Sequence, residues 1–197
     1  MKKKTNIWIL LGTLLIAAGV LLGGYNVIER ISAQRSSVLL AQQLVEAMPE
    51  VEQSEIPNYI LDPDAEMPTK EIDGVEYVGL LKILSLGLEL PIADKWSYSQ
   101  FMKSPCRYIG SAYKGNLVIA AHNYPSHFGN LKKLHEGDEV IFTDMDGNVF
   151  RYCVVELETL MPTETDEMKN GDWDITLFTC TIGGRTRVTV RCVAVVE

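Results

Sequence analysis

Hydrophobic and polar residues follow three successive patterns along the chain, and the first is a long apolar run. Residues 7–28 contain no charged side chain. As a helix rising about 1.5 Å per residue they extend about 33 Å, enough to cross the hydrocarbon core of a bilayer. Lys2, Lys3 and Lys4 precede the run and favour a cytoplasmic N-terminus. The sequence therefore predicts a cytoplasmic tail over residues 1–6 and a transmembrane anchor over residues 7–28.

A cleaved signal peptide is the competing interpretation of this N-terminal segment, because it too begins with positive charge and an apolar core. The run is longer than a usual signal core, and no clean small-x-small site follows it closely. We therefore favour the anchor. Under either interpretation, the rest of the chain works outside the cytoplasm.

Polar residues dominate the second pattern, residues 29–73, for which we expect a juxtamembrane helix and an acidic linker. Residues 29–48 have a helical composition, with a partly apolar stripe of Leu39, Leu40, Leu44 and Ala47. Residues 49–73 are rich in proline and acidic residues and poor in large apolar ones, which is typical of a solvated spacer.

The third pattern, residues 74–197, consists of short apolar stretches separated by turn signals and predicts an all-β barrel or sandwich. Asp146-Gly147 and Gly183-Gly184 are hairpin signals between neighbouring stretches. Helical structure is expected only at residues 97–103 and 131–135. The predicted strands are residues 76–83, 88–92, 116–122, 139–143, 149–160, 174–180 and 187–196.

Length, charge and cysteine content exclude several classes of protein. The 197 residues leave room for one ordinary domain with attachments. A net charge of −8 argues against nucleic-acid binding, which needs a basic face. The four cysteines form no CxxC pair, so a zinc site is not expected, and their disulfide pairing stays open.

Candidate chemistry gathers where predicted strands end. Cys180 ends the strand 174–180, and Arg187 begins the strand after the following loop, so a hairpin would place them side by side. A guanidinium beside a thiol favours the thiolate and holds a developing oxyanion. His122 ends another apolar strand and titrates near neutrality, as acid–base work requires. Taken singly, each is more often structural; together they make nucleophile, proton carrier and oxyanion stabiliser.

The order of these motifs resembles the sortase family. Residues 176–180, TLFTC, followed by the RVTV of residues 187–190, are similar to the TLxTC…R signature, and residues 121–123, AHN, resemble the histidine motif. Residues 128–140 are similar to the family's "F..L..L..GD.V" stretch, and residues 77–92 match its opening strands. The resemblance covers the whole domain from about Tyr77.

The resemblance implies a closed eight-stranded β-barrel with short helices and a cysteine transpeptidase activity. Cys180 would attack a C-terminal LPxTG-like sorting motif and form a thioester, His122 would carry the proton, and Arg187 would stabilise the oxyanion. Thr179 and Asn123 are implied as substrate-binding residues. Arg185 is a rival to Arg187, which we prefer because it directly precedes the Val-x-Val strand.

Partners and location follow from the same resemblance. The partners would be exported proteins bearing the sorting motif and an amine acceptor on a cell-wall peptide or a pilin. The catalytic domain would be extracellular on a single-pass membrane protein of a Gram-positive organism. No metal or other cofactor is expected. Some sortases use Ca²⁺, but scattered surface carboxylates explain the acidic loops better. These loops contain Asp144, Asp146, Glu164, Asp166 and Glu167.

Two other functions compete with this interpretation. A membrane-anchored β domain serving as an adhesin or assembly scaffold would explain the anchor and strands but leave the His/Cys/Arg set as coincidence. Another cell-wall cysteine hydrolase is less favoured, because papain-like enzymes place Cys before His and L,D-transpeptidases have a glycine before the cysteine. His127 and His135 are expected to be solvated, and Cys153 and Cys192 to serve packing or a disulfide.

Overall fold

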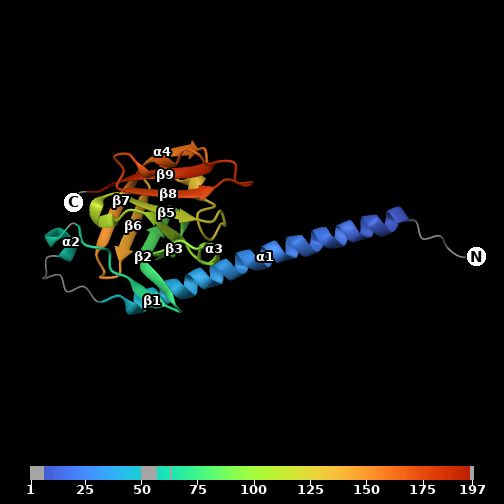
Figure 1. The fold of residues 1–197 in the computed structure, drawn as a ribbon, viewed down its shortest axis with the longest axis horizontal. Helices are drawn as coiled ribbons and strands as arrows, with labels where there is room; N and C mark the ends of the chain where they lie inside the picture. The colour runs from blue at the N-terminus through green and yellow to red at the C-terminus, as the bar shows by residue number, and fades with distance from the viewer. Residues whose placement is uncertain (1–6, 50–56, 63, 196–197) are drawn as a thin grey trace, which may run out of the picture.

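The computed structural model describes residues 7–49, 57–62 and 64–195, which form a β-barrel with one long helix projecting from it (Figure 1). The helices are α1 (Ile7–Ala47), α2 (Asn58–Leu61), α3 (Tyr98–Phe101) and α4 (Thr165–Lys169), and single 3-10 turns span Leu84–Leu86, Ala112–Lys114 and Leu131–Lys133. The strands are β1 (Lys70–Ile72), β2 (Val75–Ile83), β3 (Leu88–Ala93), β4 (Cys106–Ile109), β5 (Leu117–Ala121), β6 (Glu139–Asp144), β7 (Val149–Leu160), β8 (Ile175–Cys180) and β9 (Arg187–Ala194).

Eight of these strands close into a barrel. Their order is β2-β3-β4-β5-β8-β9-β7-β6, and β6 pairs back onto β2. The short β1 pairs with the start of β2 and stands outside the closed ring. Two neighbouring pairs, β3–β4 and β5–β8, are parallel, and the other pairs are antiparallel. The predicted closed eight-stranded barrel is therefore confirmed.

The barrel interior is a single apolar core built from inward-facing residues of nearly every strand. Its fully buried members include Leu81, Ile83, Ile119, Phe142 and Leu177. β5 is buried at every position, because its inner face meets this core while Val118 on its outer face packs against Leu160 and Met168. A strand covered on both faces reads as a continuous apolar run, which is how residues 117–121 stand out in the sequence.

The predicted strands are found within a few residues of their expected positions, with residue 196 outside the described chain. Four helices and strands were not predicted: α2, β1, β4 and α4. β4 has only four residues, and three of them are partly or fully exposed. It pairs through its backbone with β3 and β5, and a strand held in that way leaves little trace in the hydrophobic pattern.

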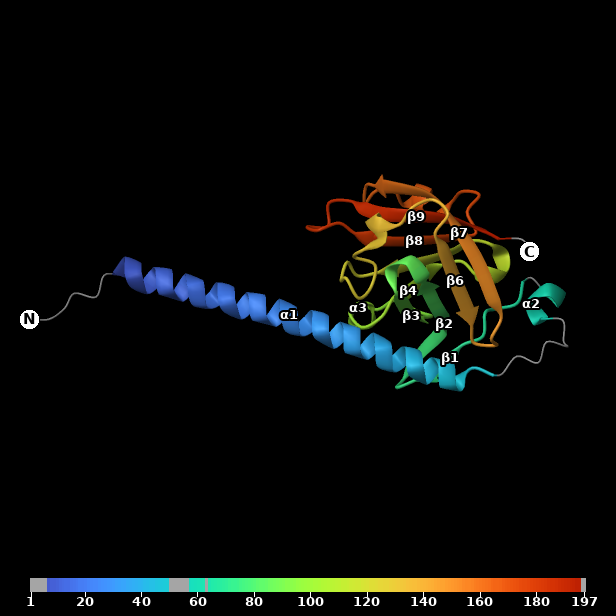
Figure 2. The same ribbon diagram turned by 180° about the vertical axis from the view of Figure 1, so that it is seen from behind.

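Helix α1 has two halves with different surroundings. Among the described residues it is the helix long and apolar enough to cross a membrane, and its apolar stretch is unburied (Figure 2). Toward its C-terminal end it lies against the barrel, where Ala33, Ser37, Ala41 and Leu44 are buried. The predicted stripe is correct at Leu44, which is fully buried, and at Leu40, which packs against the same cluster. It is wrong at Leu39, which is 62% exposed, and the buried face consists mostly of small residues.

Part of the segment expected to be a solvated spacer also packs on the barrel. Met67 is 4% exposed and belongs to the main core. The Tyr59 ring stacks on Tyr113 with 5.1 Å between the ring centroids and lies at the same distance from Phe150. A few anchoring side chains in an otherwise polar segment are enough to attach it, and composition averaged over the segment hides them.

Candidate active site

The parallel pairing of β5 and β8 brings two predicted site residues to the same edge of the barrel. Ala121 of β5 and Thr179 of β8 form the last pair of this parallel ladder. His122 follows Ala121 and Cys180 follows Thr179, so both lie at the same end of the barrel. The Thr179 hydroxyl donates to the Ala121 carbonyl over 2.8 Å and ties the two strand ends together. Thr179 itself is buried.

The third predicted residue lies across the next strand pair. Cys180 and Arg187 are directly opposite each other in the antiparallel β8–β9 ladder, and both are half-buried. The connecting loop is closed by a bond from the Thr181 amide to the Thr186 carbonyl at 3.0 Å. Gly183 and Gly184 have positive φ values of 84° and 70°, a conformation that glycine adopts without strain. The loop thus fixes which residue faces the cysteine.

The Arg187 guanidinium is oriented by the loop it closes. One of its terminal nitrogens, Nη1, donates to the carbonyls of Gly184 and Thr186, each over 3.3 Å. A guanidinium has five N–H donors in a fixed plane, so donors remain for another group beside Cys180. Arg185 is exposed in the loop and is not in register with the cysteine.

His122 lies between two aromatic rings. Its ring stacks on Tyr124 with centroids 4.2 Å apart and an interplanar angle of 17°, and the Phe101 ring lies 5.7 Å away on α3. Burial lowers the pKa of His122, an effect that a hydrogen bond to the Asn123 side chain and the nearby carboxylate of Glu29 oppose. Its Nδ1 atom is buried without a hydrogen-bond partner. The neutral imidazole is therefore favoured at neutral pH.

The prediction of a solvated His127 is wrong. His127 is completely buried, and its Nε2 atom lies 3.0 Å from the Ser37 hydroxyl of α1. Since that hydroxyl donates to the Lys103 carbonyl over 3.0 Å, the imidazole is the donor to Ser37. Burial, together with the nearby His122, lowers the pKa of His127 to about 4. His135 is exposed, as expected.

Helix α4 and Arg191 form a wall beside the strand that ends in Cys180. Arg191 is 2% exposed and donates to Glu158 over 2.6 Å, to Thr176 over 3.0 Å and to the carbonyl oxygens of Glu167 and Met168 on α4. These bonds hold α4 against the outer faces of β8 and β9. A buried, multiply bonded arginine was not recognised in the sequence, because nothing local distinguishes it from Arg187.

The other cysteines and the acidic turn have structural surroundings. All four cysteines are free, and burial raises the pKa of Cys106 and of Cys192 to about 12, which keeps both thiols protonated. The Asp144 carboxylate accepts hydrogen bonds from the Asp146 amide, from Asn148 and from the Tyr113 hydroxyl at 2.7 to 2.9 Å. This carboxylate thus closes the β6–β7 hairpin, and the described residues contain no cluster of three metal-binding side chains.

A surface pocket of about 610 Å³ runs along β4, and His122, Cys180 and Arg187 are not among the residues that line it. Trp96, Arg107 and Tyr108 line it, and Arg107 pairs with Asp94 on its wall. Tyr108 also meets Phe178 of β8 edge-on, with centroids 5.4 Å apart. Phe178 lies two residues before Cys180, so the pocket and the cysteine are joined by an aromatic surface.

Comparisons with known proteins agree with this geometry. Residues 81–196 match the "Sortase domain" family. Sortase A of Bacillus anthracis is 26% identical over 176 residues, covering 85% of this chain and 83% of that protein. The Clostridium perfringens sortase D5 transpeptidase has a TM-score of 0.60 at 22% identity, with 84% of this chain and 99% of that chain covered. Clostridium perfringens sortase C, solved with the C-terminal cell wall sorting motif, has a TM-score of 0.55 at 22% identity, covering 88% of this chain and 91% of that chain.

The closed mixed barrel carries a cysteine and a histidine at the ends of adjacent strands. The matched segment covers more than half of the chain, and the chain belongs to the sortase family of cysteine transpeptidases. Its relatives carry the names sortase A, C and D at similar identity, so the likeness defines the family and not a subclass.

Proposed function

We propose that this sortase cleaves a C-terminal LPxTG-like sorting motif of exported proteins and transfers the acyl group to an amine of a cell-wall peptide or a pilin. The observation that carries the proposal is the strand register. Cys180 lies opposite Arg187 in the β8–β9 ladder. Thr179 and Ala121, which directly precede Cys180 and His122, are paired in the β5–β8 ladder. Similarity to a sortase C solved with a cell wall sorting motif supports a substrate of that kind.

Each of the three residues has a separate role in this reaction. Neutral His122 takes the proton of the Cys180 thiol. The resulting thiolate attacks the scissile carbonyl carbon, and Arg187 donates hydrogen bonds to the oxyanion that forms. The C–N bond then breaks, and His122 gives its proton to the leaving amine. The incoming amine loses a proton to His122 as it displaces the thioester, and the thiolate is regenerated. Thr179 and Asn123 belong to the proposal as substrate-binding residues.

The N-terminal part of the chain supports a location at the cell surface. A helix whose apolar segment is unburied matches a single-pass anchor, and the lysines before it favour a cytoplasmic N-terminus. The barrel would then lie outside the membrane, where exported proteins and cell-wall amines are found.

The experiment is intact-mass spectrometry of the full chain in detergent, incubated with a panel of sorting-motif peptides, with and without an added amine. We expect a peptide adduct on the wild type, its transfer to the amine, and no adduct on Cys180→Ala. His122→Ala should slow adduct formation by about 100-fold or more, as general acid–base catalysis contributes 10²–10⁴-fold.

The competing scaffold function makes the opposite predictions. An anchored adhesin needs no reactive thiol, so Cys180 would react with iodoacetamide no faster than Cys153, the half-buried cysteine on β7. An unreactive Cys180, together with no adduct from any peptide, would therefore contradict the transpeptidase proposal.

A further inference from the structure

Exposed apolar side chains gather at the end of the barrel that carries Cys180. Trp96 is 57% exposed, Tyr98 is 73% exposed, and Ile182 in the β8–β9 loop is 94% exposed. Scattered exposed apolar residues are ordinary, but several at one end of a domain indicate a partner. Together these three residues are called the apolar rim.

Two residues of the rim, Trp96 and Tyr98, lie near the candidate site, and Tyr98 also lies near α1. Trp96 lies 6.5 Å from Phe101, whose ring is the neighbour of His122. Tyr98 is close enough to interact electrostatically with Tyr124, which stacks on His122, and with Tyr25 of α1. Tyr25 lies within the apolar segment of α1, so the rim is level with the end of that segment.

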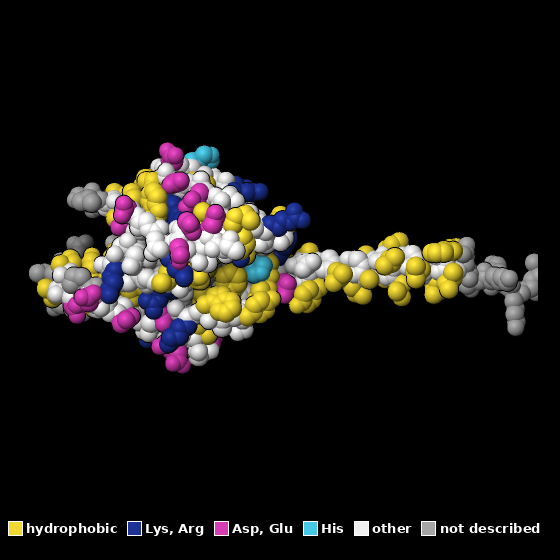
Figure 3. Space-filling view, turned by 45° about the horizontal axis from the view of Figure 1, so that its top comes forward, with side chains coloured by type: hydrophobic (Ala, Val, Ile, Leu, Met, Phe, Trp, Pro, Cys, Tyr) yellow, Lys and Arg dark blue, Asp and Glu magenta, His cyan; other side chains and the backbone are white. Residues whose placement is uncertain are grey.

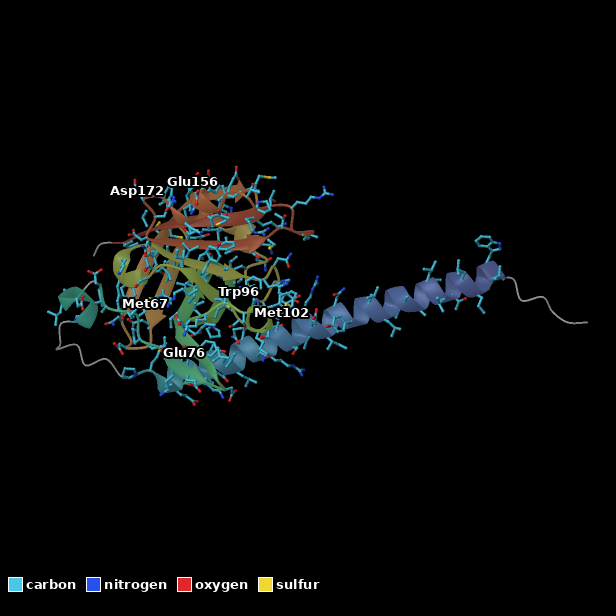
Figure 4. All side chains as sticks on the ribbon, viewed as in Figure 1. Met67, Glu76, Trp96, Met102, Glu156 and Asp172 are labelled. Carbon is cyan, nitrogen blue, oxygen red and sulfur yellow. The ribbon has the colours of Figure 1, made fainter. Side chains whose placement is uncertain are left out.

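The views of the whole molecule also place the rim on the side from which the apolar half of α1 extends. The β8–β9 loop projects toward the side on which the N-terminal half of α1 extends (Figures 1 and 2). Hydrophobic side chains form a continuous area beside a histidine at the point where the helix leaves the domain (Figure 3). Trp96 and Met102 lie at this end, while Asp172 lies at the opposite end of the barrel (Figure 4).

We propose that the apolar rim rests in the interfacial layer of the membrane, so that the end of the barrel carrying Cys180 faces the bilayer. Tryptophan and tyrosine favour this layer, because their rings combine an apolar body with a polar edge. The bilayer is the occupant because the apolar segment of α1 enters it directly beside the rim. This inference rests on the proposed membrane anchor.

A rim that rests on the membrane determines the direction from which substrates reach Cys180. A rim seated in the interface closes the bilayer side of the barrel and leaves Cys180 within reach of polypeptides held at the membrane surface. Peptides in bulk solution must then enter between the barrel and the bilayer.

The chain's three tryptophans test this arrangement, because they occupy three different levels. Trp8 lies in the apolar segment of α1, Trp96 lies in the rim, and Trp173 precedes β8 at the end of the barrel opposite Cys180. Full-length variants that keep one tryptophan each, with phenylalanine at the other two positions, are reconstituted into liposomes. Emission is compared between lipids that carry bromine at a shallow acyl position and lipids without bromine.

We expect Trp96 emission to fall by about half in brominated lipid, since rings of the interfacial belt lie near the shallow bromines, and Trp173 emission to stay unchanged. Trp8 is the positive control for insertion. Quenching of Trp8 without quenching of Trp96 would overturn the seated rim. So would equal quenching of Trp96 and Trp173, which would indicate a barrel lying in no fixed orientation.

Activity measurements on the same liposomes separate this inference from the proposed function. An active chain with unquenched Trp96 would refute the seated rim alone. An inactive chain with quenched Trp96 would leave the rim in place and count against the transpeptidase proposal. The Tyr98→Ser variant of the Trp96 protein tests the contact further, since losing a ring from the rim should weaken Trp96 quenching while Trp8 quenching is unchanged.

Discussion

Arg187 and Arg185 are two residues apart, yet the β8–β9 ladder gives them different surroundings. Arg187 faces Cys180 and is held by two carbonyls of its own loop, whereas Arg185 is exposed at the turn. An oxyanion stabiliser must be fixed in place before charge develops, because the donor otherwise has to reorient during the reaction. At the scale of single residues, position in the ladder therefore distinguishes two arginines that are alike in chemistry.

We predict that Arg187→Ala lowers kcat/KM for peptide transfer by about 100-fold or more, since removing one oxyanion donor typically costs 10²–10³-fold. Arg185→Ala is the matched control and should change kcat/KM by no more than about 3-fold, because surface substitutions away from a site have small effects. Steady-state transpeptidation assays check both. The reverse ranking would assign the role to Arg185.

His127 gives the protein a pH-dependent stability. Its pKa is about 4 in the folded chain against an ordinary value of 6.5, because burial opposes the charged form. Between those two values the unfolded chain binds more protons than the folded chain, so stability rises with pH there and is lost as the pH falls through 6.5 toward 4. Burial lowers the pKa of His122 in the same direction.

We predict that acidification from pH 7 to pH 4.5 destabilises the wild type by on the order of 2–3 kcal/mol through His127, as 1.36 kcal/mol corresponds to one pKa unit. His127→Gln should remove most of this part of the pH dependence, leaving the smaller part due to His122. Thermal unfolding of the detergent-solubilised chain across this range measures both. His135→Gln, at an exposed position, should leave the slope unchanged, and an unchanged slope in His127→Gln would contradict the prediction.

At the scale of elements, α1 joins the barrel through small side chains. Ala33, Ser37 and Ala41 recur every four residues and so occupy one face of the helix, with Leu44 completing the contact. Small residues let the helix axis approach the barrel closely, and the Ser37 hydroxyl then reaches both Lys103 and His127. The helix thus supports the loop that follows His122.

We predict that Ser37→Val destabilises the chain by about 1–3 kcal/mol, because the buried His127 Nε2 and the Lys103 carbonyl each lose their partner. Transfer activity should fall with it, since the loop after His122 loses a contact. Ser32→Ala, on the exposed face of the same helix, is the control. A Ser37→Val protein with unchanged melting temperature would show that the helix does not dock in this way.

At the scale of the whole molecule, the barrel is completed by segments that come before it in sequence. Leu44 is fully buried in a cluster with Tyr77, Ala93, Cys106 and Met145, and Met67 enters the main core. These contacts belong to residues that precede the first strand of the closed ring. Part of the barrel is thus covered by the chain that connects it to the apolar helix.

We predict that a chain beginning at residue 29 is more stable than one beginning at residue 74. Each fully buried leucine or methionine contributes roughly 1.5–3 kcal/mol, so losing Leu44 and Met67 alone costs several kcal/mol. Chemical denaturation of the two soluble proteins gives the difference. The shorter chain should also bind a hydrophobic dye at its uncovered surface, and equal stability of the two would mean that the packing of residues 29–73 contributes nothing.

The sequence by itself determined the features that depend on local pattern. Most of the strands and the apolar helix follow from alternation and apolar runs, which leave a barrel and a sandwich both open. The resemblance of the motif order to sortases implies the closed barrel and selects Cys180, His122 and Arg187 as the candidate site residues. The hairpin around Gly183-Gly184 predicts which residues flank the loop, because the loop is short and its chemistry is local.

The tertiary structure alone decided the features that join residues distant in sequence. β4 exists because β3 and β5 flank it, and His127 is buried because Ser37, ninety residues away, covers it. Arg191 can bond to the carbonyl oxygens of α4 only because that helix packs over β9. Burial and hydrogen-bond partners of this kind depend on how whole elements pack, and packing between distant segments leaves no periodic signal in either one.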